Sequence, residues 1–249
     1  MLDLLRFELA EAFDSVPWVV YYWVFFAFQY FIYGQLVSRL VVNLSDYYTY
    51  YGTGLLIIMT FNISTWAGRR FVEGAHEGRL RYVLSLPFTR GELFLEQVLL
   101  GLVVSVVRIG PPLALILYLT GRPLYTLATS MAVLLVMSVG IMGIMIALSF
   151  VAFKSFDIYS AIVAGMSAVL IRFSTILYPL NFMPAAYAGP SLANPLTYGA
   201  DLLRSALSID VSALADPVLS AFVVVAVGAC TLTIGMALVP RALEGVKSS

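Results

Sequence analysis

The sequence predicts an all-α, polytopic membrane protein with six transmembrane helices. Its 249 residues are 61% hydrophobic and 11% charged, with a mean hydropathy of +0.94, whereas soluble domains carry about 25% charged residues. A membrane-spanning helix needs about 20 consecutive apolar residues, and six windows of the chain fit that length. These windows are residues 17–37, 50–68, 98–119, 124–153, 158–178 and 217–239. The whole chain, 1–249, is therefore expected to form a single transmembrane domain.

The segment before the first window has the pattern of a helix that lies in the membrane interface. Leu2, Leu5, Leu9 and Phe13 recur at helical spacing, and the acidic residues of the segment fall elsewhere. Such a pattern predicts an amphipathic, interfacial helix. An ordinary polar tail is the alternative interpretation.

The first predicted span is unusually aromatic, and Tyr22, Phe26 and Tyr30 recur along it at intervals of four residues. Aromatic faces can stack on planar or sugar-like ligands, so these three residues are candidates for a translocation path. Tyr and Trp also gather at membrane interfaces and in contacts between subunits. The sequence leaves these interpretations open.

A polar segment, residues 69–96, separates the second and third predicted spans and contains five of the 14 Lys and Arg residues. Leu80, Val83, Leu84 and Pro87 follow the i, i+3, i+4, i+7 spacing of an amphipathic helix. Pro87 is expected to end that helix. From the residues alone, a docking elbow and a solvated loop are equally supported.

Charge pairs and a capping signal support helices at both ends of this segment. Arg69–Glu73 and Glu77–Arg81 are i, i+4 pairs of opposite charge. Thr89 and Glu92 form the pattern of a capping box, which predicts a second helix that leads into the third span.

Two predicted spans contain arginine, which is costly in a bilayer and marks a candidate functional site. Arg108 lies near the middle of the third span, followed by Pro111 and Pro112, and Arg172 lies near the end of the fifth. A facing helix and the translocation path are both open for Arg108, whereas Arg172 can reach toward the membrane surface. In the fourth span, Gly140 and Gly143 form a small-residue face suited to close helix packing.

Residues 179–207 are expected to form short helices that enter the outer leaflet and return. Pro179 and Pro184 break the chain, and Asn194 before Pro195 is a strong start signal for a helix. Asp201 and Arg204 then lie three residues apart on one helix face and can pair.

The distribution of basic residues predicts the orientation of the chain. With six spans, nine basic residues outside the spans share one side with both termini and with segment 69–96, against three on the other side. By the positive-inside rule, both termini and segment 69–96 are expected in the cytoplasm.

Several function classes find no support in the sequence. No glycine-rich P-loop precedes Lys154 or Lys247, so any ATP must be hydrolysed by another polypeptide. The single cysteine, Cys230, and the single histidine, His76, provide neither a disulfide framework nor a histidine metal cluster. No carboxylate lies at the centre of a predicted span, as ion-coupled secondary transporters would require.

Three stretches of the chain resemble parts of the permease subunits of type 2 ABC transporters. The sequence EGRLRYVLSLP at Glu77–Pro87 is similar to the coupling-helix region of that family. YPLNFMP at Tyr178–Pro184 and NPLTYGADLLR at Asn194–Arg204 are similar to the stretch before its last span. These stretches occur in the family's order within a chain of six predicted spans.

The resemblance implies the role of individual residues. The residues implied to dock on an ATPase are Glu77, Gly78, Arg79, Leu80, Leu84 and Pro87. The outer re-entrant motif consists of Pro179, Pro184, Asn194, Pro195, Asp201 and Arg204. Arg79 follows Gly78 at a position where the family often has Thr or Ser. This difference is expected to affect which ATPase the segment recognises.

The resemblance also implies the function and the partners. The chain would be the pore subunit of an ATP-driven exporter in the cell membrane, without a catalytic site, metal or cofactor of its own. A second permease copy and two ATP-binding cassette subunits, which carry ATP and Mg, are the expected partners, with membrane lipid around them and no nucleic acid. The expected substrate is amphiphilic: a lipid-linked compound, a drug or a glycan. A non-transporting sensor or assembly factor and an ion-coupled secondary transporter are the alternatives.

Overall fold

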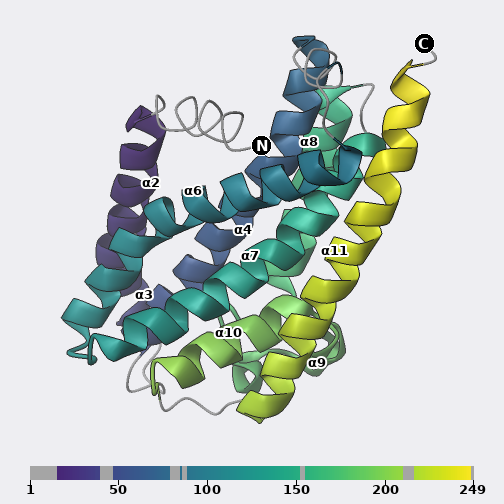
Figure 1. The fold of residues 1–249 in the computed structure, drawn as a ribbon. Coiled ribbons are helices and arrows are strands. Elements are labelled where there is room, and N and C mark those ends of the chain that lie inside the picture. Colours follow the sequence, from purple (N-terminus) through teal and green to yellow (C-terminus); the bar gives the residue numbers. More distant parts are fainter. Residues whose placement is uncertain are drawn as a thin grey trace.

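The computed structural model describes residues 16–39, 47–78, 85, 89–151, 155–209 and 216–247, and every regular element within these ranges is helical (Figure 1). In chain order the elements are α2 (Val16–Phe28), the π-helix η1 (Gln29–Tyr33), α3 (Gly34–Ser38), α4 (Tyr47–His76), α6 (Arg90–Leu119), α7 (Tyr125–Val151), α8 (Phe156–Arg172), the 3₁₀-helix η2 (Leu180–Phe182), α9 (Ala185–Leu192), α10 (Pro195–Ala206) and α11 (Pro217–Lys247). The predicted all-α class is confirmed. The expected interfacial helix at the N-terminus lies outside the described residues.

Within the described ranges, four helices are long and apolar enough to cross a membrane. They are Val16–Ser38, Arg90–Leu119, Tyr125–Phe150 and Pro217–Leu238, which correspond to the first, third, fourth and sixth predicted spans. The second predicted span lies in α4, a 30-residue helix with hydroxyl and amide side chains along its middle. The fifth lies in α8, which has only 17 residues. The six-span count therefore stays a prediction for these two helices.

Helix α7 lies at the centre of the bundle. It packs along α11 on one side and along α4 and α6 on the other, while α10 crosses the end of the α7–α11 pair (Figure 1). α8 packs on α4, and α2 lies at the edge of the bundle against α6. The helices that surround α7 bury a continuous apolar core that extends from α4 through α6 and α7 to α10.

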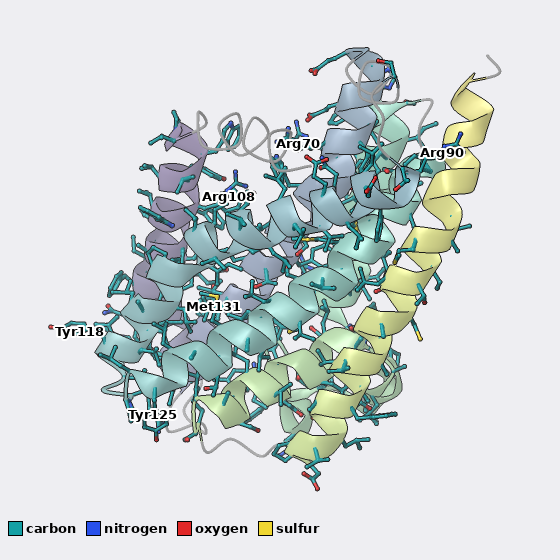
Figure 2. All side chains as sticks on the ribbon, viewed as in Figure 1. Arg70, Arg90, Arg108, Tyr118, Tyr125 and Met131 are labelled. Atoms are coloured by element: carbon teal, nitrogen blue, oxygen red, sulfur yellow. The ribbon has the colours of Figure 1, made fainter. Side chains whose placement is uncertain are left out.

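The ends of the long helices gather at two opposite ends of the bundle. α4 and α11 end, and α6 begins, at the upper end in Figure 1. The turn between α6 and α7 lies at the lower end, together with α9, α10 and the start of α11. Figure 2 shows Arg70 and Arg90 toward the upper end, and Tyr118 and Tyr125 at the lower end. The end of α4 and the start of α6 thus lie at the opposite end of the bundle from α9 and α10.

A cluster of three buried serines joins the central helices. Ser138 on α7 lies 2.8 Å from the hydroxyl of Ser64 on α4 and 3.1 Å from that of Ser105 on α6. Ser64 and Ser105 also donate to carbonyls one turn back in their own helices. Hydrogen bonds between helices are a main source of cohesion in membranes, where water cannot satisfy a hydroxyl.

The predicted small-residue face of α7 lies against α11. A Cβ atom added at Gly140 would lie 3.1 Å from the Cα of Gly228, and one added at Gly143 would lie 2.9 Å from the backbone of Thr231. Any side chain at these positions would force the two helices apart. The close approach explains why α7 and α11 form the most extensive helix pair of the bundle.

This close contact predicts that Gly143→Ala destabilises the bundle, although alanine is the better helix former. Overpacking of a tight contact costs about 1–3 kcal/mol, which outweighs a helix-propensity gain of about 1 kcal/mol. The measurement is reversible unfolding in mixed micelles.

The matched control is Gly165→Ala in α8, because a Cβ atom there meets nothing within 4 Å. This variant is expected to be as stable as the wild type or slightly more so. Equal effects of the two substitutions would contradict the close-packing account.

Candidate functional site

The helices that flank the predicted coupling segment have well-defined ends. α4 ends at His76, and the exposed residues Glu77 and Gly78 follow it. Gly78 has φ +77°, the left-handed conformation that commonly ends a helix and that glycine adopts without steric cost. The glycine of the EGRLRYVLSLP stretch thus has a structural role. Arg79, Leu80, Leu84 and Pro87 lie outside the described residues.

The predicted capping box at the start of α6 is confirmed. The Thr89 side chain accepts from the Glu92 backbone N–H at 3.3 Å, and the Glu92 carboxylate accepts from the Thr89 N–H at 2.7 Å. The predicted Arg69–Glu73 pair is also present, with 2.7 Å between Nε and Oε1. The ion pair thus supports the last turns of α4, and the capping box defines the start of α6.

α6 continues through Pro111 and Pro112 without interruption.

A groove of about 290 Å³ lies between α2 and α4, and we call it the α2–α4 groove. The residues that line it from α2 and η1 are Tyr21, Tyr22, Phe25, Phe26 and Gln29. The residues that line it from α4 are Leu55, Ile58, Met59, Asn62, Thr65, Trp66 and Arg69. The groove therefore combines an aromatic and aliphatic lining with a polar strip that ends in a cation.

Two of the predicted path residues, Tyr22 and Phe26, line this groove, and Tyr30 does not. Tyr30 is fully buried and packs on Tyr48, with 4.3 Å between the ring centroids. Gln29 lies three residues after Phe26 and seven after Tyr22, which ordinary helical spacing places on the same face, and it lines the groove. The π-helical turn Gln29–Tyr33 begins at this residue.

Arg108 lies on α6 directly behind the groove. Its guanidinium carbon is 5.2 Å from the ring centroid of Tyr22 and 5.4 Å from that of Trp66, and both rings line the groove. The Trp23 indole donates to the Arg108 carbonyl at 3.1 Å, which ties α2 to α6. Arg108 is only 3% exposed.

Two aromatic rings stabilise the buried guanidinium of Arg108. Each cation–π contact contributes about 0.5–2 kcal/mol, so the two together are comparable with the cost of about 2.5–3.5 kcal/mol that insertion scales give for an arginine at the centre of a membrane helix. The Nε atom has no hydrogen-bond acceptor, and in the described part of the chain no carboxylate pairs with this guanidinium. Arg108 is thus a buried cation stabilised mainly by two rings.

At the opposite end of α4, Asn194 holds the end of α8. Its side-chain amide donates to the carbonyls of Leu170 and Phe173 at 2.6 and 2.7 Å. Its oxygen accepts from the Leu196 N–H at 3.0 Å and caps α10, whose first residue is Pro195, as predicted. Because Asn194 takes up the terminal carbonyls of α8, the helix ends at Arg172 rather than near residue 178, where the span was expected to end.

Arg204 on α10 satisfies the backbone that follows α8. Its Nη2 donates to the carbonyls of Thr175 and Ile176 at 3.0 Å each, and its Nε donates to Thr53 Oγ1 at 3.2 Å. Its guanidinium carbon lies 3.6 Å from the ring centroid of Tyr50, and the Tyr50 hydroxyl also donates to the Thr175 carbonyl.

The predicted pair between Asp201 and Arg204 is present, at 3.8 Å and with both side chains buried. Pro179 lies at the start of η2 and Pro184 at the start of α9, so both prolines mark the breaks that the sequence predicts. The outer motif therefore acts as a clamp that joins α4, α10 and the turn after α8.

This clamp predicts that Arg204→Lys destabilises the protein although it keeps the charge. Lysine cannot donate to both carbonyls and to Thr53 while lying flat on the Tyr50 ring, so buried acceptors lose their partners. The expected loss is about 3 kcal/mol, as for other broken buried charge networks, measured by unfolding in mixed micelles.

Arg172→Lys is the matched control, because Arg172 is exposed at the end of α8. It is expected to leave the unfolding midpoint unchanged. A wild-type midpoint for Arg204→Lys would show that the clamp contributes little to stability.

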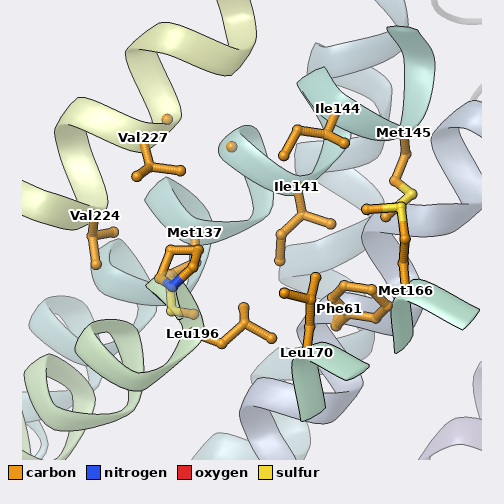
Figure 3. Close-up of a pocket in the computed structure, with 13 residues that line it drawn as sticks. Phe61, Met137, Ile141, Ile144, Met145, Met166, Leu170, Leu196, Val224 and Val227 are labelled. Carbon is orange, nitrogen blue, oxygen red and sulfur yellow. The ribbon is translucent and has the colours of Figure 1, made fainter. Parts of the chain in front are cut away.

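A second cavity, of about 60 Å³, lies where α7 and α10 meet α8 and α11 (Figure 3). Its lining includes Met137, Ile141, Met166, Leu196 and Val224, and no polar side chain belongs to it. The cavity can accept hydrocarbon but offers nothing to a polar group. For this reason the α2–α4 groove is the better candidate for a substrate site.

An all-α bundle of long apolar helices, with an amphiphilic groove and buried arginines, defines a multi-pass membrane protein with the features of a transporter. A comparison with protein families matches residues 17–208 to the family described as ABC-2 type transporter. The match covers more than half of the chain, and the chain belongs to this family. It is thus a transmembrane permease of the ABC class, a membrane domain that is not itself catalytic and that works with ATP-binding cassette subunits. No curated protein matches the chain.

The contribution of α4 to the groove was not predicted from the sequence. The candidates for the translocation path came from the aromatic first span, and Asn62, Thr65 and Trp66 were not among them. Asn62 gave a usable signal, because an amide within a predicted membrane span is rare unless it faces another helix or a cavity. In the structure Asn62 is exposed to the groove.

Proposed function

We propose that the chain is the membrane-spanning permease subunit of an ATP-driven ABC exporter and forms the path for an amphiphilic substrate. The substrate is a lipid-linked compound, a drug or a glycan. The permease works as a dimer, with itself or with a related chain, in the cell membrane with both termini in the cytoplasm. Two ATP-binding cassette subunits bind it through segment 69–96, and they carry the ATP and Mg.

The family match carries this proposal, and the arrangement of the helix ends supports it. α4 ends and α6 begins at the end of the bundle where α11 also ends, away from α9 and α10. A partner that binds there meets the exposed residues Glu77 and Gly78 without contacting the re-entrant helices. The described charges near this end also include the Arg69–Glu73 pair.

The continuity of α4 gives the proposal a mechanism. The same helix carries Tyr50 and Thr53 in the clamp, Asn62 and Trp66 in the groove, and ends next to Glu77. A helix of 30 residues is about 45 Å long at 1.5 Å per residue. When the ATPase pair closes, a push on segment 69–96 would tilt α4 about its clamped end. The groove would then open to one side of the membrane or the other.

A docking variant tests the proposed coupling. Glu77→Lys combined with Leu84→Asp reverses an exposed charge and places a carboxylate on the expected apolar face, so binding of a candidate ATP-binding cassette subunit should fall by about tenfold or more. Co-purification and the ATPase rate of the complex measure the effect.

Asp216→Lys is the control, since it reverses an exposed charge at the start of α11, at the other end of the bundle. It should leave complex formation unchanged. An intact complex with the docking variant, or equal losses with both variants, would argue against segment 69–96 as the docking site.

Labelling of single cysteines tests the proposed orientation. In a Cys230→Ser background, Glu77→Cys and Asp216→Cys place thiols at exposed positions at opposite ends of the bundle. A membrane-impermeant maleimide should label Asp216→Cys on intact cells, and Glu77→Cys only after permeabilisation. Labelling of both thiols on intact cells would refute the topology.

A further inference from the structure

We propose that Arg108 is the counter-ion for an acidic headgroup, a phosphate or a carboxylate, of an amphiphile held in the α2–α4 groove. This inference rests on the proposed function, because it names the chemical class of the substrate. It also assigns a role to a buried cation that the fold alone does not require.

The position of Arg108 carries the first step. The rings of Tyr22 and Trp66, which line the groove, are also the rings that contact its guanidinium, at 5.2 and 5.4 Å. The guanidinium therefore lies behind these two rings, and a displacement of one of them would be needed to bring it to the groove surface. Among the described residues its Nε has no acceptor, so this donor is available to an anion.

The charge around the groove points to the same ligand. Arg70 lies over the Trp66 ring at 4.9 Å, on the same indole as Arg108, and Arg69 lines the groove. Arg69 is paired with the carboxylate of Glu73, whereas in the described residues no carboxylate pairs with Arg108 behind the same groove. An uncompensated cation at this place favours an anionic occupant.

The rest of the groove fits a hydrocarbon or another flat apolar body. Phe25 and Phe26 face Leu55, Ile58 and Met59 across it. An occupant with one acidic group and an apolar body satisfies both halves of the lining. Guanidinium groups bind phosphate and carboxylate through two parallel hydrogen bonds, so the headgroup would be held in a fixed orientation.

Three probes separate charge from hydrophobicity in a binding experiment on the full chain in nanodiscs of phosphatidylcholine. Dodecyl phosphate has an anionic headgroup and a chain, dodecylphosphocholine has the same chain with a zwitterionic headgroup, and inorganic phosphate has the anion alone. Titration calorimetry, corrected with empty nanodiscs, measures each affinity. The wild type should bind dodecyl phosphate about tenfold more tightly than either other probe, the size of effect expected from one charge-assisted contact.

Substitutions of Arg108 assign that preference to the residue. Arg108→Gln should reduce the preference for dodecyl phosphate to about one, and Arg108→Lys should retain part of it because the charge stays while the two-pronged contact is lost. Arg172→Gln is the matched control: it removes an exposed arginine of α8 that does not line the groove, and it should keep the full preference. If Arg108→Gln does not fold, as judged by gel filtration, the wild-type probes and Arg108→Lys still decide the question.

Equal wild-type affinities for the two dodecyl probes, or a preference that survives Arg108→Gln, would overturn the assignment. Inorganic phosphate that binds as tightly as dodecyl phosphate would overturn the amphiphile and indicate a free anion. The assay contains no ATPase, so its outcome is independent of the docking experiment. A headgroup preference without complex formation would refute the exporter and leave the anion site; the reverse would leave the exporter and refute the anion site.

Discussion

The continuity of helix α4 is the constraint on which the other features depend. It is helical without a break from Tyr47 to His76, and its backbone hydrogen bonds are internal to the helix. Its first turns are held by Arg204 and its last turn leads to Gly78. Any displacement at the Gly78 end must therefore be taken up along the groove, where Trp66 and Asn62 would move relative to α2.

The clamp at the other end of α4 shows why the chain needs buried polar side chains near the membrane. A backbone that leaves helical geometry away from water must find partners for its carbonyls. After α8 these partners are the amide of Asn194 and the guanidinium of Arg204. Side chains of α10 and of its N-cap thus take up four carbonyls at the end of α8 and in the turn after it, and Arg204 ties this turn to α4 through Thr53.

Local patterns in the sequence predicted local structure well, whereas most contacts between distant segments were not predicted. The capping box at Thr89, the start of α10 after Asn194 and the Arg69–Glu73 pair depend on residue types within a few positions, and the structure contains all three. The end of α8 depends on side chains more than 20 residues away, so hydropathy alone extended that helix too far. The groove likewise depends on how α2 lies against α4, and the packing of one helix on another cannot be derived from the residues of either helix alone.

Three arginines in or near the membrane differ in function because they differ in partners. Arg204 contacts two carbonyls, a hydroxyl, a carboxylate and an aromatic ring. Its charge and its hydrogen-bond donors are therefore satisfied within the fold. Arg172 is exposed at a helix end and needs no partner from the protein. Arg108 is as buried as Arg204, yet among the described residues its guanidinium contacts two aromatic rings and no carboxylate. A buried cation without an anion is costly, and an acidic ligand in the α2–α4 groove would supply that anion.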